Sequence, residues 1–231
     1  MERNRVFSVL GLAFLATGCI TGSPPPNAAA TPAAPEAAAT PATDAPATAS
    51  APLVVWDGDK NANGKGWASC GKKEGCTTSI EPAANEGHAG AGLKFKADGP
   101  DWIGMGWNWH GWWPENAGSD ISAYKELSFR IKVIAANSKE APDPNSIGVT
   151  IGCSANGTKD DSKKDADDAK VADFTTNLTD GQWHDVVIPL ATFFTDKGKD
   201  FDKKSAWELR VSTWSQDPRK FEILLDDIAF R

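Results

Sequence analysis

Tryptophan is concentrated in one short stretch, Asp101–Pro114, which reads DWIGMGWNWHGWWP and holds five of the ten tryptophans. A protein gathers indole rings either to fill a core or to stack them on a flat ligand, such as the apolar C–H face of a sugar ring. Amide and carboxylate side chains beside the rings would then bind hydroxyl groups. The residues expected to bind such a ligand are Trp107, Trp109, His110, Trp112, Trp113 and, from a later segment, Trp214.

The stretch is predicted to begin as a strand and to end as an aromatic loop. A helix is disfavoured because each of its glycines would cost about 1 kcal/mol there. Trp107 and Trp109 stay open between core and ligand, whereas Trp112, Trp113 and Trp214 flank turns and are expected to be accessible. Side chains of a strand alternate between its faces, so the two predicted faces are Ile103, Met105, Trp107 and Trp109 on one side, and Trp102, Gly104, Gly106 and Asn108 on the other.

The sequence contains no recognisable catalytic constellation. A glycosidase needs two carboxylates about 5–10 Å apart across a cleft, and Glu208 has no partner motif. No G-x-S-x-G, H-E-x-x-H or phosphate-loop motif occurs, and the three histidines are scattered. The net charge of −7, without a basic stripe, argues against nucleic acid as a partner. We expect a monomer that is not an enzyme.

Cysteine usage fits an exported protein. Cys70 and Cys76 bracket the glycine-flanked turn GKKEG and are expected to form a disulfide. Zinc binding is the competing interpretation, but the spacing is not C-x₂-C and the histidines are dispersed. Cys153, in SIGVTIGCS, is expected to be a buried thiol.

Residues 1–18 are predicted to be a signal peptide. Arg3 and Arg5 precede an apolar run, Val6–Ala16, that has the length of a signal h-region and is too short to span a membrane. The segment ends LATGC and resembles a bacterial lipobox, although Ala16 stands where leucine is commonest. The resemblance implies cleavage before Cys19 and lipidation of that cysteine, with an ordinary secretory signal as the alternative.

Lipidation would tether the protein to a membrane of the cell envelope. Each buried CH₂ of an acyl chain is worth about 0.8 kcal/mol, so several chains anchor stably. Ile20, which is not the aspartate associated with inner-membrane retention, favours the outer membrane in a two-membrane cell. Residues 19–52 are rich in Ala, Pro and Thr and are predicted to be a disordered linker, either a spacer or an unselected filler.

Residues 53–231 are predicted to form one all-β domain, because strand signals recur between turns without long helical periodicity. Leu127–Val133 alternates cleanly between apolar and polar residues, which predicts a strand with one wet face. The charged segment Asn156–Lys170 is expected to be a solvated loop, and Trp56, Trp183 and Trp207 are expected in the core. The predicted strands are Leu53–Trp56, Trp67–Ser69, Thr77–Ile80, Gly92–Lys96, Ile103–Trp109, Leu127–Ile134, Ile147–Cys153, Phe174–Asn177, His184–Pro189, Trp207–Trp214 and Phe221–Phe230.

Five blocks, in order, make this domain resemble the galactose-binding-like jelly rolls of non-catalytic carbohydrate-binding modules. The resemblance implies a jelly-roll β-sandwich and binding of a polysaccharide or glycan. The blocks are the opening Val54–Asp59 with its turn to Trp67, the glycine-led Gly87–Phe95, Asp120–Phe129, Trp183–Phe193 and the closing Leu224–Phe230.

Many members of that group hold a structural calcium between the opening turn and the last strand. The positions matching this site are Asp57, Asp59, Asp226 and Asp227. Calcium prefers several carboxylate and carbonyl oxygens at once, so a bound calcium is the expected cofactor. Hydrophilic turn residues without a metal are the alternative interpretation.

Two functions remain open at this point. The first is a membrane-anchored, non-catalytic module that binds a polysaccharide. The second is a structural or assembly lipoprotein that docks another envelope protein through exposed aromatic residues, since exposed apolar patches mark either use.

Overall fold

The computed structural model describes residues 50–58, 64–71, 74–111, 118–154 and 163–231. The chain divides into two units, Met1–Ala47 and Thr48–Arg231, and the fold described below is that of the second. The predicted signal peptide, Cys19 and nearly all of the predicted linker lie outside the described residues, and these assignments stay predictions. No helix among the described residues is long and apolar enough to cross a membrane.

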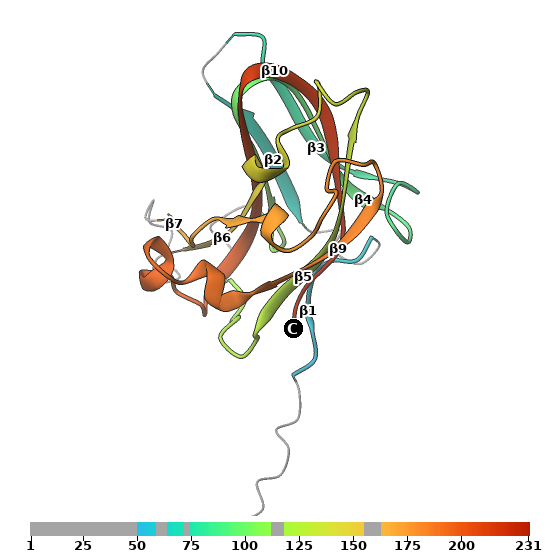
Figure 1. Cartoon of the computed structure of the whole chain (residues 1–231). Helices are drawn as coiled ribbons and strands as arrows, with labels where there is room; N and C mark the ends of the chain where they lie inside the picture. The colour runs from blue at the N-terminus through green and yellow to red at the C-terminus, as the bar shows by residue number, and fades with distance from the viewer. Residues whose placement is uncertain (1–49, 59–63, 72–73, 112–117, 155–162) are drawn as a thin grey trace, which may run out of the picture. The chain divides into compact units, whose positions relative to one another are not determined.

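Antiparallel strands dominate the described part of the second unit, with short 3-10 turns between them (Figure 1). This confirms the predicted all-β sandwich class. The strands are β1 Leu53–Trp56, β2 Lys65–Cys70, β3 Thr77–Ala83, β4 Gly92–Asn108, β5 Glu126–Ala135, β6 Gly148–Ser154, β7 Lys163–Asp165, β8 Ala169–Lys170, β9 Trp183–Pro189 and β10 Ala206–Phe230.

Two long strands, β4 and β10, pair with each other and belong to both layers of the sandwich. Their pairing shifts register between Ser215 and Arg219, opposite Gly99 and Asp101 of β4, which both have positive φ. Such a bulge bends a strand pair, and β10 arches over the top of the domain in Figure 1. We call residues 99–101 the β4 corner.

The halves of β4 and β10 on either side of the corner carry different neighbours. The first half of β4 and the last half of β10 lie between β3 and the pair β5–β9, and we call this sheet I. The second half of β4 and the first half of β10 lie between β2 and β6, with β7 and β8 beyond, and we call this sheet II.

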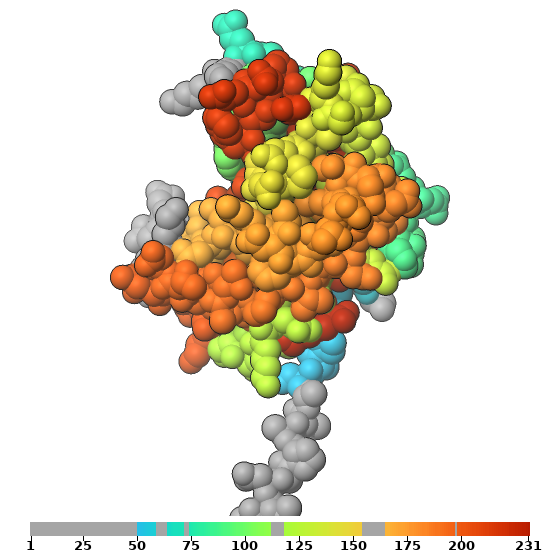
Figure 2. Space-filling model, viewed as in Figure 1, coloured from blue at the N-terminus to red at the C-terminus, as the bar shows by residue number. Residues whose placement is uncertain are grey.

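The core lies between the inner faces of the two sheets. Ile103, Met105 and Trp107 of β4 face it, as the predicted alternation requires, and Cys153 of β6 is fully buried there. The segments that follow β6 and β9 along the chain contribute further residues to the core, among them Val171, Leu178 and Phe193. This chain, orange in Figure 2, covers one side of the molecule.

The sequence-based strand boundaries need three corrections. Phe174–Asn177 is not a strand, because the chain there forms turns after a 3-10 turn, Val171–Asp173. Four predicted strands merge into β4 and β10, because their turn residues bend the strands without ending them. The described part of the predicted charged loop contains β7 and β8, which extend sheet II.

Candidate carbohydrate-binding site

The outer face of sheet II gathers three indole rings on a glycine floor, and we call this face the platform. Register aligns its residues in rows across β2, β4, β10 and β6. Side chains alternate along each strand, so each row contributes the residues that point away from the core. The rows are Trp102–Trp214, then Ser69–Gly104–Ser212–Gly148, then Trp67–Gly106–Arg210–Thr150.

Two of the three indole rings on the platform lie directly over glycines of β4. A Cβ atom on Gly106 would lie 2.1 Å from the indole Nε1 of Trp67, and one on Gly104 would lie 2.3 Å from the ring of Trp102. Each ring therefore passes directly over a strand where only glycine leaves room. Trp67 and Trp102 are half-buried, and Trp214 is 51% exposed.

A chain of polar contacts runs beside Trp67. Its indole N–H donates to the carboxylate of Glu208 at 2.9 Å, although the Glu208 side chain is only 1% exposed. The Nε of Arg210 lies 3.4 Å from the other oxygen of that carboxylate, and Nη2 contacts the carboxylate of Asp165. The Glu208 carboxylate thus orients Trp67 and Arg210, and the Arg210 side chain, which is 18% exposed, is the charged group of this chain of contacts that can reach a sugar hydroxyl.

The outer face of sheet I has a different chemistry. It carries ion pairs: Lys94 with Glu222 at 3.4 Å, Arg130 with Asp185 at 2.7 Å, and others of the same kind. Trp183, predicted to be core, is instead half-buried on this face, with its ring edge-on to His88. The two outer faces thus differ in chemistry. Among the described residues, the face of sheet I carries ion pairs, whereas the platform carries clustered indole rings.

The structure corrects the role predicted for Trp107 and Trp109. Both are 5% exposed and belong to the core. The Trp107 ring stands edge-on to Trp56 with centroids 5.2 Å apart, and Trp109 packs on Phe230 at 5.9 Å. Rings enclosed like this have no free face for a ligand, so neither belongs to the platform.

His110 lies at the end of the buried segment and not on the platform rows. Its Nε2 is 2.7 Å from the hydroxyl of Ser119, which also accepts the indole N–H of Trp109 at 3.2 Å. Burial lowers the pKa of the His110 imidazole. Trp112 and Trp113, the other predicted ligand-binding rings, lie outside the described residues.

Of the three indole rings on the platform, only that of Trp214 is among the residues predicted from the sequence to bind a ligand. Trp67 and Trp102 are not among them. Strand alternation puts Trp102 on the same predicted face as Gly104 and Gly106. A tryptophan that shares a strand face with two glycines is the sequence signal that could have identified Trp102. Trp67 offered no such signal, because its place over Gly106 depends on the register of β2 against β4.

The disulfide between Cys70 and Cys76 is confirmed, with Cα atoms 6.2 Å apart. The bridge closes the turn at the end of β2 nearest Trp102, since Cys70 pairs with Ile103 of β4.

Three of the predicted calcium ligands, Asp57, Asp226 and Asp227, lie among the described residues. Asp226 is fully buried, and its carboxylate accepts the N–H groups of His88, Ala89 and Asp227. A Cβ atom on Gly58, next to Asp57, would lie 2.8 Å from the carbonyl oxygen of Ala91. The carbonyl oxygen of Ala91 accepts the indole N–H of Trp56 at 3.1 Å, so both it and the Asp226 carboxylate are hydrogen-bonded to N–H groups of the protein.

Asp227 has a charged neighbour of its own. The Asp227 carboxylate lies 3.5 Å from Arg130, which offers the compensating charge that calcium would supply. Asp59 lies outside the described residues. Within the described ranges, no three acidic, histidine or cysteine side chains come together as a metal cluster.

A β-sandwich with indole rings and hydrogen-bonding groups on one outer face is the architecture of a carbohydrate-binding module. The family model "carbohydrate binding domain 30" matches residues 55–231, and the chain belongs to this family of non-catalytic carbohydrate-binding domains. A comparison with curated proteins finds no match.

Solved structures share the fold at low sequence identity. The family 30 carbohydrate-binding module of a cellulosomal cellulase of Clostridium thermocellum is 19% identical, with a TM-score of 0.53 over 78% of this chain and 92% of that one. Another family 30 module is 18% identical, with a TM-score of 0.54 over 78% and 98%. A family 11 module of a second C. thermocellum cellulase is 17% identical, with a TM-score of 0.51 over 78% and 94%.

Proposed function

We propose that the platform binds a polysaccharide chain, without catalysis, by stacking sugar rings on Trp67, Trp102 and Trp214. The observation that carries the proposal is the row arrangement, in which three indole rings and the Glu208–Arg210 pair share one outer face. Family membership supports the ligand class. Sugars present apolar ring faces and polar edges, and the platform offers partners for both.

Titration of the protein with soluble oligosaccharides of β-linked glucose tests the proposal. This probe is chosen because a cellulase carries one of the structurally similar modules. We expect saturable heat and a change in tryptophan fluorescence. Binding to envelope proteins with no response to any oligosaccharide would contradict the proposal and would favour the assembly function.

A lipid anchor at Cys19 is a second part of the proposed function. The support is the apolar run followed by LATGC, and the lipid would hold the platform near a membrane of the cell envelope. Mass spectrometry of the mature protein should find an acylated Cys19, and Cys19→Ala should leave the detergent phase. An intact Met1 or an unmodified Cys19 would contradict the anchor.

Calcium bound near Asp57 and Asp226 is the third part. Its role would be structural, because it would connect the turn after β1 with β10, and no ligand-binding step depends on it. The support is the match of Asp57, Asp226 and Asp227 to the calcium-binding positions of similar jelly rolls, and the preference of calcium for carboxylate oxygens.

A further inference from the structure

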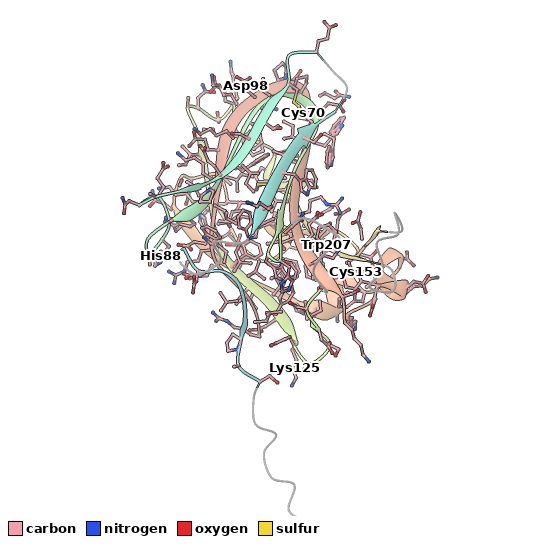
Figure 3. The ribbon with its side chains drawn as sticks, turned by 180° about the vertical axis from the view of Figure 1, so that it is seen from behind. Cys70, His88, Asp98, Lys125, Cys153 and Trp207 are labelled. Carbon is pink, nitrogen blue, oxygen red and sulfur yellow. A yellow bond between two sulfur atoms is a disulfide. The ribbon has the colours of Figure 1, made fainter. Side chains whose placement is uncertain are left out.

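The Cys70–Cys76 disulfide spans the β4 corner. Cys70 ends β2 in sheet II, and Cys76 directly precedes β3 in sheet I. Both strands pair with β4, but on opposite sides of the corner: Cys70 faces Ile103, and Thr77 faces Asp98. The covalent bridge thus closes a path around residues 99–101, and Figure 3 shows Cys70 and Asp98 at the same end of the domain.

The backbone next to the bridge contacts the corner directly. The N–H of Gly71 donates to the carbonyl oxygen of Trp102 at 2.7 Å. A Cβ atom on Gly99 would lie 2.8 Å from the Cβ of Cys76, so the corner packs against the bridge itself. Asp101 holds a φ of +79°, which costs energy for a residue other than glycine and persists only when its surroundings enforce it.

Trp102 is the first residue after this corner. Its ring passes over Gly104, and its cross-strand partner is Trp214. The direction of its side chain depends on the backbone at 101–102, where the corner and the Gly71 hydrogen bond meet. A looser corner would let the ring leave the platform, and ordering it again would weaken ligand binding.

We propose that the Cys70–Cys76 bridge is a positioning device for Trp102, which fixes the ring for glycan binding and makes affinity depend on oxidation of the two cysteines. This inference rests on the proposed function of the platform. The bridge touches no ligand, and its effect passes through the corner and Trp102 alone.

A double-mutant cycle tests the inference. Affinity for a soluble gluco-oligosaccharide is measured by calorimetry for the wild-type protein, Trp102→Ala, Cys70→Ser/Cys76→Ser, and the combination of all three. We expect the serine pair to bind about tenfold more weakly while far-UV circular dichroism shows the fold retained. In the Trp102→Ala background, removing the bridge should cause no further loss. Cys153→Ser, which alters a core cysteine far along sheet II, is the matched control and should keep wild-type affinity.

Each other outcome contradicts a defined claim. Wild-type affinity of the serine pair, or an equal loss in both backgrounds, overturns the positioning role while leaving the proposed function intact. No binding by the wild-type protein overturns the proposed function itself, and the inference with it. If the serine pair does not fold, Cys70→Ala/Cys76→Val replaces it, and unfolding of that variant too would make the bridge a requirement of the fold and overturn the inference.

Discussion

Trp102 and Trp214 stand directly opposite each other on β4 and β10, at the edge of the platform nearest the β4 corner. Trp214 is the large hydrophobic residue with the greatest exposure among those described, at 51%. Paired aromatic residues across two strands contribute to sheet stability, but half-exposed rings also leave faces uncovered. We therefore expect this pair to matter more for binding than for folding.

Trp214→Ala and Trp107→Ala should separate these two contributions. Losing the exposed Trp214 ring should weaken oligosaccharide binding by about 1–3 kcal/mol, by analogy with stacking of bases on aromatic side chains. Losing the buried Trp107 ring should instead lower the free energy of unfolding by roughly 3–5 kcal/mol. Denaturant titrations and calorimetry of both variants measure the two effects, and a Trp107→Ala protein with wild-type stability would contradict the assignment of that ring to the core.

Arg210 should be needed for both the fold and the platform. Arg210→Met removes the cation beside Glu208, whose carboxylate is almost fully buried. The buried carboxylate would keep the indole N–H of Trp67 but lose its neighbouring cation, so we expect a loss of about 3 kcal/mol in the free energy of unfolding. The double variant Arg210→Met/Glu208→Gln should recover part of that loss, because the buried charge is gone. A double variant less stable than Arg210→Met alone would contradict this coupling.

Mild acidification should lower the free energy of unfolding of the domain, because it protonates His110. Burial lowers the pKa of this imidazole in the folded state below its ordinary value of 6.5. The unfolded state then binds the proton more readily, so stability is complete above about pH 6.5 and declines as the pH falls below it. Asp120 and Asp180, whose pKa values are lowered by hydrogen bonds from Ser122 and His184 respectively, contribute only at more acidic pH.

Denaturant midpoints at pH 7.5 and pH 5.5 measure the His110 contribution. We expect the midpoint of His110→Asn to change less between the two pH values than that of the wild-type protein. An equal change in both proteins would assign the pH dependence to other groups.

Calcium should raise the melting temperature if the proposed site near Asp57 is correct. A ligand at a hundredfold excess over its dissociation constant stabilises the folded state by about 2.7 kcal/mol. Chelation should reverse the effect, and Asp57→Ala should abolish it. Asp98→Asn, which changes an exposed carboxylate paired with Lys220 beside the β4 corner, is the control and should respond to calcium as the wild-type protein does. A melting temperature that changes with neither calcium nor chelator would contradict the proposed site.

The sequence predicted most of the strands, and it predicted the two faces of Ile103–Asn108, because alternation is a local property of the chain. It did not predict which face would be buried. Which face is buried depends on which side of β4 sheet I packs against. Both faces carry tryptophan, so composition alone does not distinguish the core face from the outer face. The position of Trp67 over Gly106 depends on pairing between strands separated by a long stretch of chain. The merging of four predicted strands into β4 and β10 depends on positive φ at Gly99 and Asp101, which the sequence of the corner, Gly99–Pro100–Asp101, suggests only as a turn.

The two outer faces of the sandwich provide the most direct test of the central claim. Trp102 and Trp183 are both half-buried tryptophans on outer faces, but Trp102 belongs to the platform and Trp183 to the ion-paired face of sheet I. The decisive measurement is the calorimetric affinity of Trp102→Ala and Trp183→Ala for the same soluble oligosaccharide. We predict that Trp102→Ala weakens binding by about 1–3 kcal/mol and that Trp183→Ala keeps the wild-type affinity. The reverse result, with binding lost in Trp183→Ala and kept in Trp102→Ala, would place the glycan on sheet I and contradict the account.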